Sequence, residues 1–220
     1  MLIGISGKKQ TGKDTVCKII KALDIWNRYG DGDMLTFVKM LLKSSSPLGS
    51  MWYKHAFADK LKQVLAVILN VRVEAFEDNI FKMSYSEIAK PEGGYYTNRE
   101  LLQRFGTEVG RSISPTLWVD ALFTSYSEHD HWIIPDVRFP SEAQAIKDRG
   151  GIIIRVDRET PFHDTHPSEV ALDNYEGFDY RIDNNNDIEY LIGKVKEIMS
   201  QLNLISVSYT HLRAHETVLD

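Results

Sequence analysis

Gly7-Lys8-Lys9-Gln10-Thr11-Gly12-Lys13-Asp14-Thr15 is the stretch that decides the fold of this 220-residue chain. It has the spacing G-x-x-x-x-G-K, in which two glycines let the backbone wrap until several N–H groups point at one anion, and the lysine adds a positive charge. The apolar segment 1–5 precedes it, and apolar residues at helical spacing follow from Val16. A strand, a glycine loop and a helix N-terminus therefore stand in the order that binds phosphate.

The residue after the lysine departs from the usual motif. A Ser or Thr, whose hydroxyl binds magnesium, normally stands there, whereas this chain has Asp14 followed by Thr15. From the residues alone, the departure either weakens the assignment of a phosphate-binding loop or narrows it to one class of protein. The competing interpretation is a plain strand-to-helix turn with a surface lysine.

Composition narrows the class of protein. The chain has 26 Lys and Arg against 31 Asp and Glu, a net charge of −5, which argues against broad binding to nucleic acid or to an anionic membrane surface. The single cysteine, Cys17, is expected to be buried filler in a reducing compartment. No apolar run approaches the roughly 20 residues that span a bilayer, and residues 1–3 read as structure rather than as a signal peptide. We therefore expect a cytoplasmic protein.

Strand-like and helix-like segments alternate along the chain. Asp59, Asn98 and Ser141 are expected to cap helices, whereas the apolar run 35–42 fits either a helix or a strand. The expected strands are 1–5, 53–58, 132–135, 152–156 and 180–182, and the expected helices begin near 16, 59, 98, 115, 141 and 188. This order predicts an α/β fold with three α/β/α layers around a parallel sheet.

Two segments depart from this alternation. The middle of the chain, about 70–130, is helical in character and contains the Gly-rich loop 90–96, which is of the kind that closes over ligands. Residues 206–220 fit neither period and resemble the translation of a sequencing adapter, although a natural disordered tail would look similar. We therefore expect a single domain over 1–205, with a helical insertion and a lid-like loop at about 157–170.

A charged cluster follows the expected strand at 132–135. In an open parallel sheet ligands bind beyond the carboxyl ends of the strands, so Asp136 and Arg138 are expected to face the same crevice as the glycine loop. A carboxylate there can hold magnesium through water or orient an acceptor, and a guanidinium can bridge two phosphates. Glu142 lies one turn into the next helix. The alternatives are a surface ion pair between Asp136 and Arg138, or an Asp136 that caps a helix.

A second cluster lies on the helix that starts near Asn98. Arg99, Gln103 and Thr107 share one face at a spacing of four residues, giving a cation, an amide that can read a base edge, and a hydroxyl. Trp118 suits stacking on a base and packing in a core equally well. From the residues alone, a solvated helix with ion pairs between successive turns is the simpler interpretation of this segment.

Several motifs stand in order along residues 1–203: Gly7 to Thr15, Leu102 to Arg111, Trp118-Val119-Asp120, Ile134 to Pro140 with Glu142, and His166-Pro167-Ser168-Glu169. Together they resemble the phage-type deoxynucleoside monophosphate kinases. That family has the P-loop nucleoside monophosphate kinase fold, with helical substrate-binding and lid insertions, and its members carry Asp rather than Ser or Thr after the lysine. The resemblance implies ATP and Mg2+ as cofactors and transfer of the γ-phosphoryl group to a deoxynucleoside 5′-monophosphate, and it leaves the base open.

The resemblance also implies roles for the matching residues. ATP would bind Gly7, Lys8, Gln10, Thr11, Gly12, Lys13, Asp14 and Thr15, with Asp14 and Thr15 serving the metal. The monophosphate would bind Arg99, Gln103, Gly106, Thr107, Trp118, Asp136, Arg138 and Glu142. The catalytic residues would be Lys13, Asp14, Asp136 and Arg138.

The residues of the segment that would form the lid indicate a function less specifically. His163, Asp164 and His166 crowd together, but their one-sided spacing in a loop without cysteine is weak evidence for zinc, so a lid or adenine-side loop is the better interpretation. Arg155 and Arg158 would either clamp phosphate on closure or form a solvated strand end.

We therefore expect an ATP- and magnesium-dependent kinase of deoxynucleoside monophosphates, acting in the cytoplasm, or in the host cytoplasm if a phage encodes it. Its partners would be small molecules rather than nucleic acid or membrane, and related kinases are commonly homodimers. Phosphomevalonate kinases of the animal type resemble the chain in the glycine loop and in Asp136-Val137-Arg138, but Gln103, Thr107 and Trp118 favour an acceptor with a base. A regulatory P-loop protein that binds ATP without an acceptor is disfavoured by the second anion-binding cluster.

Overall fold

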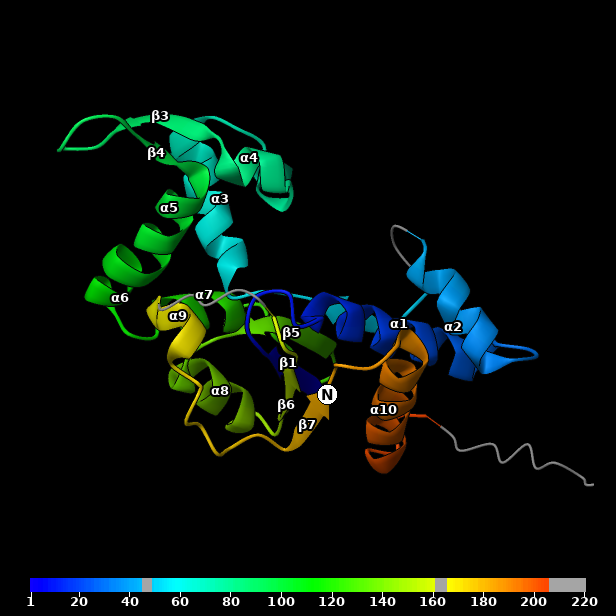
Figure 1. Ribbon diagram of the computed structural model, residues 1–220. Coiled ribbons are helices and arrows are strands. Elements are labelled where there is room, and N and C mark those ends of the chain that lie inside the picture. Colours follow the sequence, from blue (N-terminus) through cyan, green and yellow to red (C-terminus); the bar gives the residue numbers. More distant parts are fainter. Residues whose placement is uncertain (45–48, 161–165, 206–220) are drawn as a thin grey trace, which may run out of the picture.

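The computed structural model describes residues 1–44, 49–160 and 166–205, and its core is a five-stranded parallel sheet in the order β2-β5-β1-β6-β7. β1 lies at the centre, between β5 and β6, and the glycine loop leaves its carboxyl end (Figure 1). The loop therefore sits where the connections to the two halves of the sheet diverge, which is where ligands bind in such sheets. The strands are β1 (Leu2–Ser6), β2 (Trp52–Lys54), β5 (His131–Val137), β6 (Ile152–Asp157) and β7 (Tyr180–Asp183).

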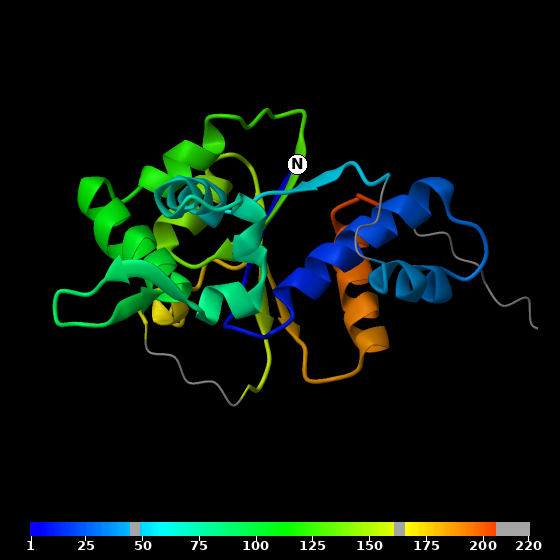
Figure 2. The same cartoon turned by 90° about the horizontal axis from the view of Figure 1, so that it is seen from above.

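Helices cover both faces of this sheet (Figure 2). One face is covered by α1 (Lys13–Tyr29), α2 (Met34–Leu42) and α10 (Ile188–Gln201), and the other by α7 (Leu117–Phe123) and α8 (Pro140–Lys147). The central strands are buried on both faces, which explains why their sequences are continuous apolar runs. The predicted three-layer α/β/α fold is confirmed.

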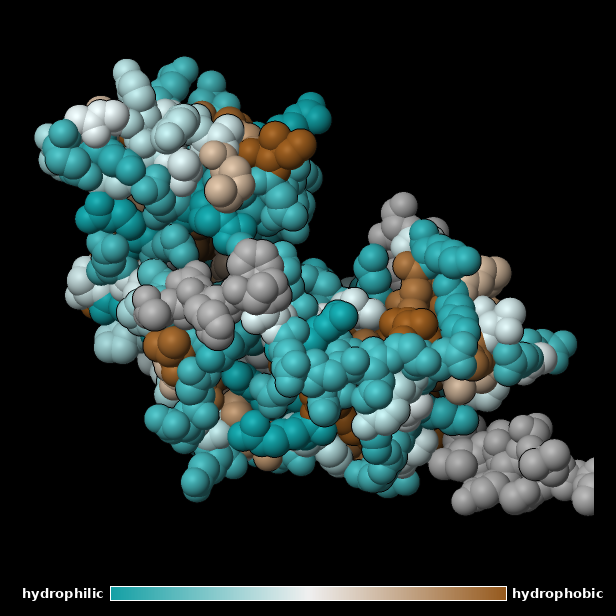
Figure 3. All heavy atoms as spheres, in the orientation of Figure 1, coloured by the Kyte–Doolittle hydropathy of each residue, from teal (hydrophilic) through white to brown (hydrophobic). Residues whose placement is uncertain are grey.

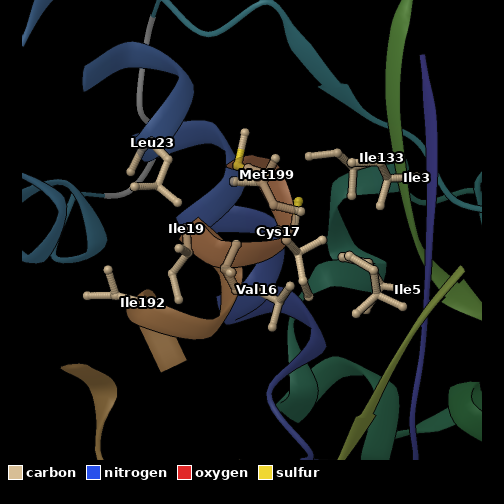
Figure 4. Close-up of a cluster of buried hydrophobic side chains, with 14 of the residues drawn as sticks. Ile3, Ile5, Val16, Cys17, Ile19, Leu23, Ile133, Ile192 and Met199 are labelled. Atoms are coloured by element: carbon tan, nitrogen blue, oxygen red, sulfur yellow. The ribbon is translucent and has the colours of Figure 1, made fainter. Parts of the chain in front are cut away.

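The larger core lies between the sheet, α1 and α10 (Figure 4). Ile3 and Ile5 extend from one face of β1, because side chains alternate along a strand, and they pack with Val16 and Ile19 of α1. Cys17 belongs to the same cluster, and burial raises the pKa of its thiol to about 11. The predicted role of Cys17 as buried filler is confirmed.

A lobe formed by residues 58–113 rises from the core on the side of the glycine loop (Figure 1). It has a small core of its own around Leu61, Leu65, Phe76 and Leu101. Its elements are α3 (Ala58–Leu69), the 3-10 helix η1 (Val73–Glu77), α4 (Asn79–Met83), β3 (Tyr85–Ala89), β4 (Tyr95–Thr97), α5 (Asn98–Gln103), the π-helix η2 (Arg104–Val109) and α6 (Gly110–Ile113).

The lobe contains a β-hairpin, which the prediction of a middle region that is helical in character, with a loop at 90–96, did not include. β3 and β4 pair antiparallel, and the segment 90–96, predicted as a loop, supplies their turn and the start of β4. The backbone N–H of Lys90 donates to the carbonyl oxygen of Gly94 at 2.9 Å, and that of Gly93 donates to Lys90 at 3.0 Å. Residues of β3 alternate between exposed and half-buried. Its sequence has too few apolar residues for the alternation of apolar and polar residues that marks a strand.

Three helices begin differently from the prediction, because other residues cap them. Asp59 lies inside the first turn of α3, whose first N–H groups are bound by Asp136 from β5. Ser141 lies inside α8, which begins at Pro140. Thr97, rather than Asn98, caps α5. In the first case the capping group comes from another part of the chain, which a search for local caps does not consider.

The apolar run 35–42, which fits either period, lies in the helix α2. A single turn, α9 (Pro167–Val170), lies beside the glycine loop. Residues 161–165 of the predicted lid and the predicted tail 206–220 lie outside the described residues. Within the described ranges, no helix has both the length and the apolar character to cross a membrane.

Candidate active site

The glycine loop between β1 and α1 has no room for side chains at two positions. A Cβ atom on Gly7 would lie 2.4 Å from the carbonyl oxygen of Val156, and one on Gly12 would lie 2.5 Å from Nδ2 of Asn184. Gly12 also has a φ of 99°, a conformation that favours glycine. The two glycines therefore let the loop pack directly against the ends of β6 and β7.

Buried polar contacts hold the same loop in place. Oγ1 of Thr11 donates to the carbonyl oxygen of Lys8 at 3.0 Å, and the carbonyl oxygen of Thr11 accepts from Nδ2 of Asn184 at 2.8 Å. Both side chains are buried. Asn184 was missed from the sequence, although its place directly after a strand could have indicated it. The shape of the loop thus depends on the end of β7 as well as on β1.

Lys13 places a positive charge over the loop. Its Nζ donates to the carbonyl oxygens of Gly7 at 2.7 Å and Lys8 at 2.6 Å. Burial, helped by the charge of Arg138, lowers the pKa of this amine to about 8, although the carboxylate of Glu169 acts in the opposite direction. An anion bound at the loop would favour the charged form of Lys13.

Asp14 is paired with a lysine that the sequence did not indicate. Its Oδ1 accepts from Nζ of Lys54, at the end of β2, at 2.8 Å. Desolvation acts to raise the pKa of Asp14, but the bond and charge of Lys54 outweigh it and hold that pKa below its usual value. The carboxylate of Asp14 and the hydroxyl of Thr15 are hard oxygen ligands, so these residues fit the expected magnesium ion.

Asp136, at the end of β5, ties the core to the lobe. Its two carboxylate oxygens accept from the backbone N–H groups of Phe57 and Ala58, each at 3.0 Å. Burial raises the pKa of this carboxyl, whereas the two amide donors favour its charged form. Asp136 therefore caps α3, as one of the two alternatives predicted, and it also lines the cavity described below.

Arg138 is paired with a carboxylate on α9. Its Nη1 donates to Oε1 of Glu169, whose other oxygen accepts from the backbone N–H of Lys9 in the glycine loop at 3.1 Å. The predicted alternative, an ion pair between Asp136 and Arg138, is not found among the described residues. Glu169 was left without a role because its partners lie 31 and 160 positions away in the sequence.

Glu142 is nearly enclosed and binds three donors. Its Oε2 accepts from the backbone N–H groups of Arg138 at 2.7 Å and Phe139 at 3.0 Å, and its Oε1 accepts from Nη2 of Arg111 at 2.8 Å. Burial raises the pKa of this carboxyl to about 7, against those donors. The guanidinium of Arg111 also lies 3.5 Å from the ring centroid of Phe139. Arg111, to which the sequence assigned no role, therefore joins the lobe to the core.

The predicted substrate residues of the lobe lie on one continuous helix, α5-η2-α6. Its winding changes along its length, because residues 104–109 form a π-helix before α6 resumes the α-helical turn. Such turns are frequent at functional sites. Arg99, Gln103 and Thr107 line the cavity from this helix. Nε of Arg99 is buried without a hydrogen-bond partner in the described part of the chain, so this guanidinium can serve an anion.

Trp118 supports the π-helical turn. Its Nε1 donates to the carbonyl oxygen of Gly106 at 2.8 Å, and a Cβ atom on Gly110 would lie 2.5 Å from Nε1 of the indole ring. The indole packs against the lobe core and also lines the cavity. Both alternatives for Trp118 are thus compatible with its position, and stacking on a base stays a prediction.

These groups share a cavity of about 710 Å³ between the glycine loop, the end of β5 and the lobe. The space-filling view shows the lobe rising from the body of the molecule, with open space between it and the region of α2 (Figure 3). The cavity brings together Gln10, Lys13, Asp14, Arg99, Gln103, Gly106, Thr107, Trp118, Asp136, Arg138 and Glu142 of the predicted residues. Gly7, Lys8, Thr11, Gly12 and Thr15 do not line it. Its wall also carries Lys54, Lys62 and Lys82, which the sequence did not indicate.

Comparison with known proteins identifies the family. The family model named deoxynucleotide monophosphate kinase matches residues 51–195, which include the lobe and the ends of β5 and β6. The chain belongs to the deoxynucleotide monophosphate kinase family. It is therefore a phosphotransferase that phosphorylates nucleoside monophosphates with ATP as the second substrate.

Curated relatives of this kinase come from viruses. A protein of Acanthamoeba polyphaga mimivirus, provisionally assigned as a deoxynucleotide monophosphate kinase, is 27% identical over 213 residues, covering 89% of this chain and 94% of the relative. The deoxynucleoside-5′-monophosphate kinase of Escherichia phage T5 is 24% identical over 215 residues, with 78% and 85% covered. The deoxynucleotide monophosphate kinase of Enterobacteria phage T4 is 31% identical over 111 residues, with 47% and 46% covered.

A second cavity of the kinase, about 510 Å³, lies against the glycine loop and is lined by Lys8 and Thr11. Arg155, which also lines it, is buried: its Nε donates to Oδ1 of Asp157 at 2.8 Å and its Nη1 to Oγ of Ser6 at 3.3 Å. Arg155 is therefore held within β6, whereas Arg158 is exposed. The clamping role expected of these arginines stays a prediction.

The histidine cluster of the predicted lid is described only in part. His163 and Asp164 lie outside the described residues, and His166 accepts a hydrogen bond from the backbone N–H of Ser168 at 3.3 Å at the start of α9. In the ranges that the structure describes, no three His, Cys, Asp or Glu side chains gather as they would around a metal ion.

Proposed function

We propose that this kinase transfers the γ-phosphoryl group of magnesium-bound ATP to the 5′-phosphate of a deoxynucleoside monophosphate, giving ADP and the deoxynucleoside diphosphate. The observation that carries the proposal is the cavity of about 710 Å³, in which the glycine loop faces the lobe helix with Arg99 and Gln103. A protein that only bound ATP would have no use for a second set of anion-binding and base-binding groups opposite the loop.

The triphosphate would lie along the glycine loop. The loop N–H groups and the N-terminus of α1 offer hydrogen-bond donors and a positive dipole, and Lys13 and Arg138 add charge beside them. The ribose and base would extend into the cavity of about 510 Å³, because Lys8 and Thr11 bring that cavity up to the same loop.

Magnesium, when bound, neutralises charge on the β- and γ-phosphates. We assign it to Asp14 and Thr15, whose oxygen atoms are of the type that it prefers. Support comes from Lys54, whose Nζ lies 2.8 Å from Oδ1 of Asp14, because the carboxylate already binds a cation. With Asp14 engaged by the metal, Lys54 would offer its positive charge to the cavity that it lines.

The acceptor would bind to the lobe half of the cavity. Arg99 and Lys82 suit its 5′-phosphate, since both line the cavity and Nε of Arg99 is buried without a partner among the described residues. The amide of Gln103 and the hydroxyl of Thr107 would read the base, because both can donate and accept hydrogen bonds. Trp118 would form the apolar wall beside it.

The transfer requires positioning and neutralisation rather than a covalent intermediate. The acceptor phosphate is already an anion, so the protein must place it in line with the γ-phosphoryl group, exclude water and balance the charge with Lys13 and Arg138. Asp136 and Glu142 are engaged with backbone N–H groups at the starts of α3 and α8. We therefore assign to Asp136, predicted as catalytic, a role in positioning the lobe, and to Glu142 a role in positioning Arg138.

An assay of ADP release tests this function directly. The kinase is supplied with ATP, magnesium and, one at a time, each deoxynucleoside monophosphate, the matching ribonucleotides and phosphomevalonate. ADP should appear only with deoxynucleoside monophosphates, and the diphosphate product should be identified by chromatography. Equal ADP release without any acceptor would indicate an ATPase, and release with phosphomevalonate alone would indicate a different acceptor.

We also propose a cellular compartment and an oligomeric state for the kinase. The kinase would act in the cytoplasm, where ATP and deoxynucleoside monophosphates are available, and would work on these small molecules without nucleic acid. A homodimer is proposed from the resemblance to related kinases, and light scattering of the purified chain measures its mass in solution.

A further inference from the structure

Glu169 occupies the two groups that a transferred phosphate would use. Its side chain is only 9% exposed, with one oxygen on Nη1 of Arg138 and the other accepting from the backbone N–H of Lys9 at 3.1 Å. It also lies close enough to Lys13 for its negative charge to act against the burial that lowers the pKa of that amine. A loop N–H, a guanidinium and a lysine are the donors that a phosphoryl group requires, and here a carboxylate holds two of them.

This contact is local to the phosphoryl site and is not part of the core packing. Glu169 lies on α9, a single turn, and contributes to the wall of the cavity together with Ser168. Arg138 is about one third exposed at 36%, so its guanidinium can turn into the cavity without opening the core. Glu176, by contrast, is exposed and is not among the residues that line either cavity.

We propose that Glu169 is a positioning residue that acts as an internal substitute for phosphate: its carboxylate holds Arg138 and the loop N–H of Lys9 in the empty enzyme and yields both to the triphosphate. The proposal rests on the proposed function for the identity of the site. Two anions cannot share the same donors, because like charges a few ångströms apart repel strongly in a partly desolvated site. Arrival of the γ-phosphate therefore displaces Glu169 and transfers Arg138 to the reacting group.

The exchange has two consequences for the catalytic cycle. Before ATP binds, Arg138 is held at the loop, so less conformational freedom is lost when the reactants assemble. After transfer, the carboxylate of Glu169 competes with the phosphates of ADP for the same donors and thereby favours product release. Glu169 thus weakens binding of phosphate chains in return for faster turnover.

Binding of inorganic pyrophosphate, measured by calorimetry, tests the proposal without any acceptor. In Glu169→Gln the amide keeps the size of the side chain but no longer competes as an anion, and pyrophosphate should bind about tenfold more tightly than to the unchanged chain. The matched control is Glu176→Gln, which also replaces a carboxylate by an amide in the segment between β6 and β7, and which should change the affinity less than about twofold. In steady-state assays, Glu169→Gln should lower KM for ATP without raising kcat.

Three results would overturn the proposal. Equal or weaker binding of pyrophosphate to Glu169→Gln would mean that Glu169 does not compete. An equal gain in Glu176→Gln would reduce the effect to net charge, and a lower kcat at unchanged KM for ATP would mark a fixed structural role. If Glu169→Gln fails to fold, Glu169→Asp serves instead: its shorter side chain cannot span Arg138 and Lys9 together, so its affinity should also rise. A chain that binds pyrophosphate but phosphorylates no monophosphate would refute the proposed reaction and leave this test intact.

Discussion

The glycine loop and the lobe, which face each other across the cavity, rest on cores of different size. The loop joins β1 to α1, which contribute to the large cluster shared with β6, β7 and α10, and Thr11 and Asn184 lock it through buried hydrogen bonds. The lobe rests on a small cluster around Phe76 and leaves apolar side chains such as Val67 and Ile80 more than 80% exposed, at 83% and 81%. The donor half of the site is therefore held rigidly, whereas the acceptor half is attached more loosely.

This difference in support indicates that the loop and the lobe have different roles in the reaction. A rigid loop fixes the phosphate chain of the donor, and a lobe attached through Asp136 and the Arg111–Glu142 ion pair can adjust to the acceptor and then close. Changes in the core half should therefore alter ATP binding and stability, and changes in the lobe half should alter use of the acceptor. Arg138 lines the cavity between the two halves, and its loss should lower turnover far more than it weakens ATP binding.

Arg138→Ala should have the largest effect. Removing the guanidinium that neutralises the transferred charge should lower kcat about 1,000-fold or more, as loss of comparable arginines does. The dissociation constant for ATP, measured by calorimetry, should change only a few-fold, because the loop and Lys13 remain. Arg149→Ala is the matched control, since Arg149 pairs with the carbonyl oxygen of Ala145 on α8 and does not line the cavity. Unchanged turnover in Arg138→Ala would refute its role.

Asp14→Asn should come next. The substitution removes the carboxylate assigned to magnesium, so activity should fall about 100-fold, and excess magnesium should restore part of it because the weakened site is then filled by mass action. Titration of activity with magnesium measures both effects. An unaffected variant would place the metal on Thr15 alone.

Two glycine substitutions compare the sensitivity of the rigid loop with that of the lobe. Gly12→Ala combines a φ of 99° with a Cβ contact of 2.5 Å on Asn184, and should lower the free energy of unfolding by about 2–4 kcal/mol and weaken ATP binding. Gly93→Ala has a similar φ of 104°, no atom of the described residues lies within 4 Å of the added Cβ, and the change should cost only about 1–2 kcal/mol. Denaturant unfolding and ATP titration measure these differences. Equal losses of stability and ATP affinity in both variants would contradict the distinction.

Gln103→Ala should affect the acceptor alone. Losing hydrogen bonds to the base should raise KM for the preferred deoxynucleoside monophosphate about tenfold, with KM for ATP unchanged within twofold. Gln144→Ala is the control, because Gln144 is exposed on α8 and bonds Asp148 at 2.7 Å outside the cavity. If Gln103→Ala raised KM for ATP as much as KM for the acceptor, the division between the two halves would be wrong.

The pH dependence of ATP binding should report on the loop. Lys13 has a pKa of about 8 in the free enzyme, and a bound phosphate chain raises that pKa, so binding takes up a proton above pH 8. Affinity for ATP should therefore fall as pH rises, by about tenfold between pH 7.5 and pH 9. Lys13→Arg, which stays charged throughout, should bind ATP with little change over the same range. An equal pH dependence in both proteins would assign the proton to another group.

The sheet and its covering helices could be predicted from local patterns. Ile152 to Val156 is a continuous apolar run, which is typical of a strand buried on both faces, and α1 repeats its apolar residues at helical spacing. The hairpin of the lobe could not be predicted in this way, because β3 is half-exposed and its polar residues hide the period of two. The start of α3 was misplaced because Asp136, 78 and 79 positions away, binds its first N–H groups.

The candidate site divides in the same way. Lys13, Asp14, Arg138 and Gln103 could be predicted, because they belong to motifs or share a helix face, and the structure brings them to one cavity. The place of Asn184 after a strand could have marked it as a site residue, but its hydrogen bond to Thr11, 173 positions away, could not be predicted. The same holds for Lys54 and Glu169, whose partners come from other strands and turns.

The amino-acid sequence alone thus determines the phosphate loop, the alternation of strands and helices and the kinds of charge near the site, because backbone conformation and residue spacing are local properties. Which donor meets which acceptor was decided by the fold. Asp136 caps a helix, Lys54 neutralises Asp14, and Glu169 takes the place of a phosphate, because the parallel sheet brings the ends of distant strands to one edge. Such pairings depend on distances in space, and those exist only after the chain has folded.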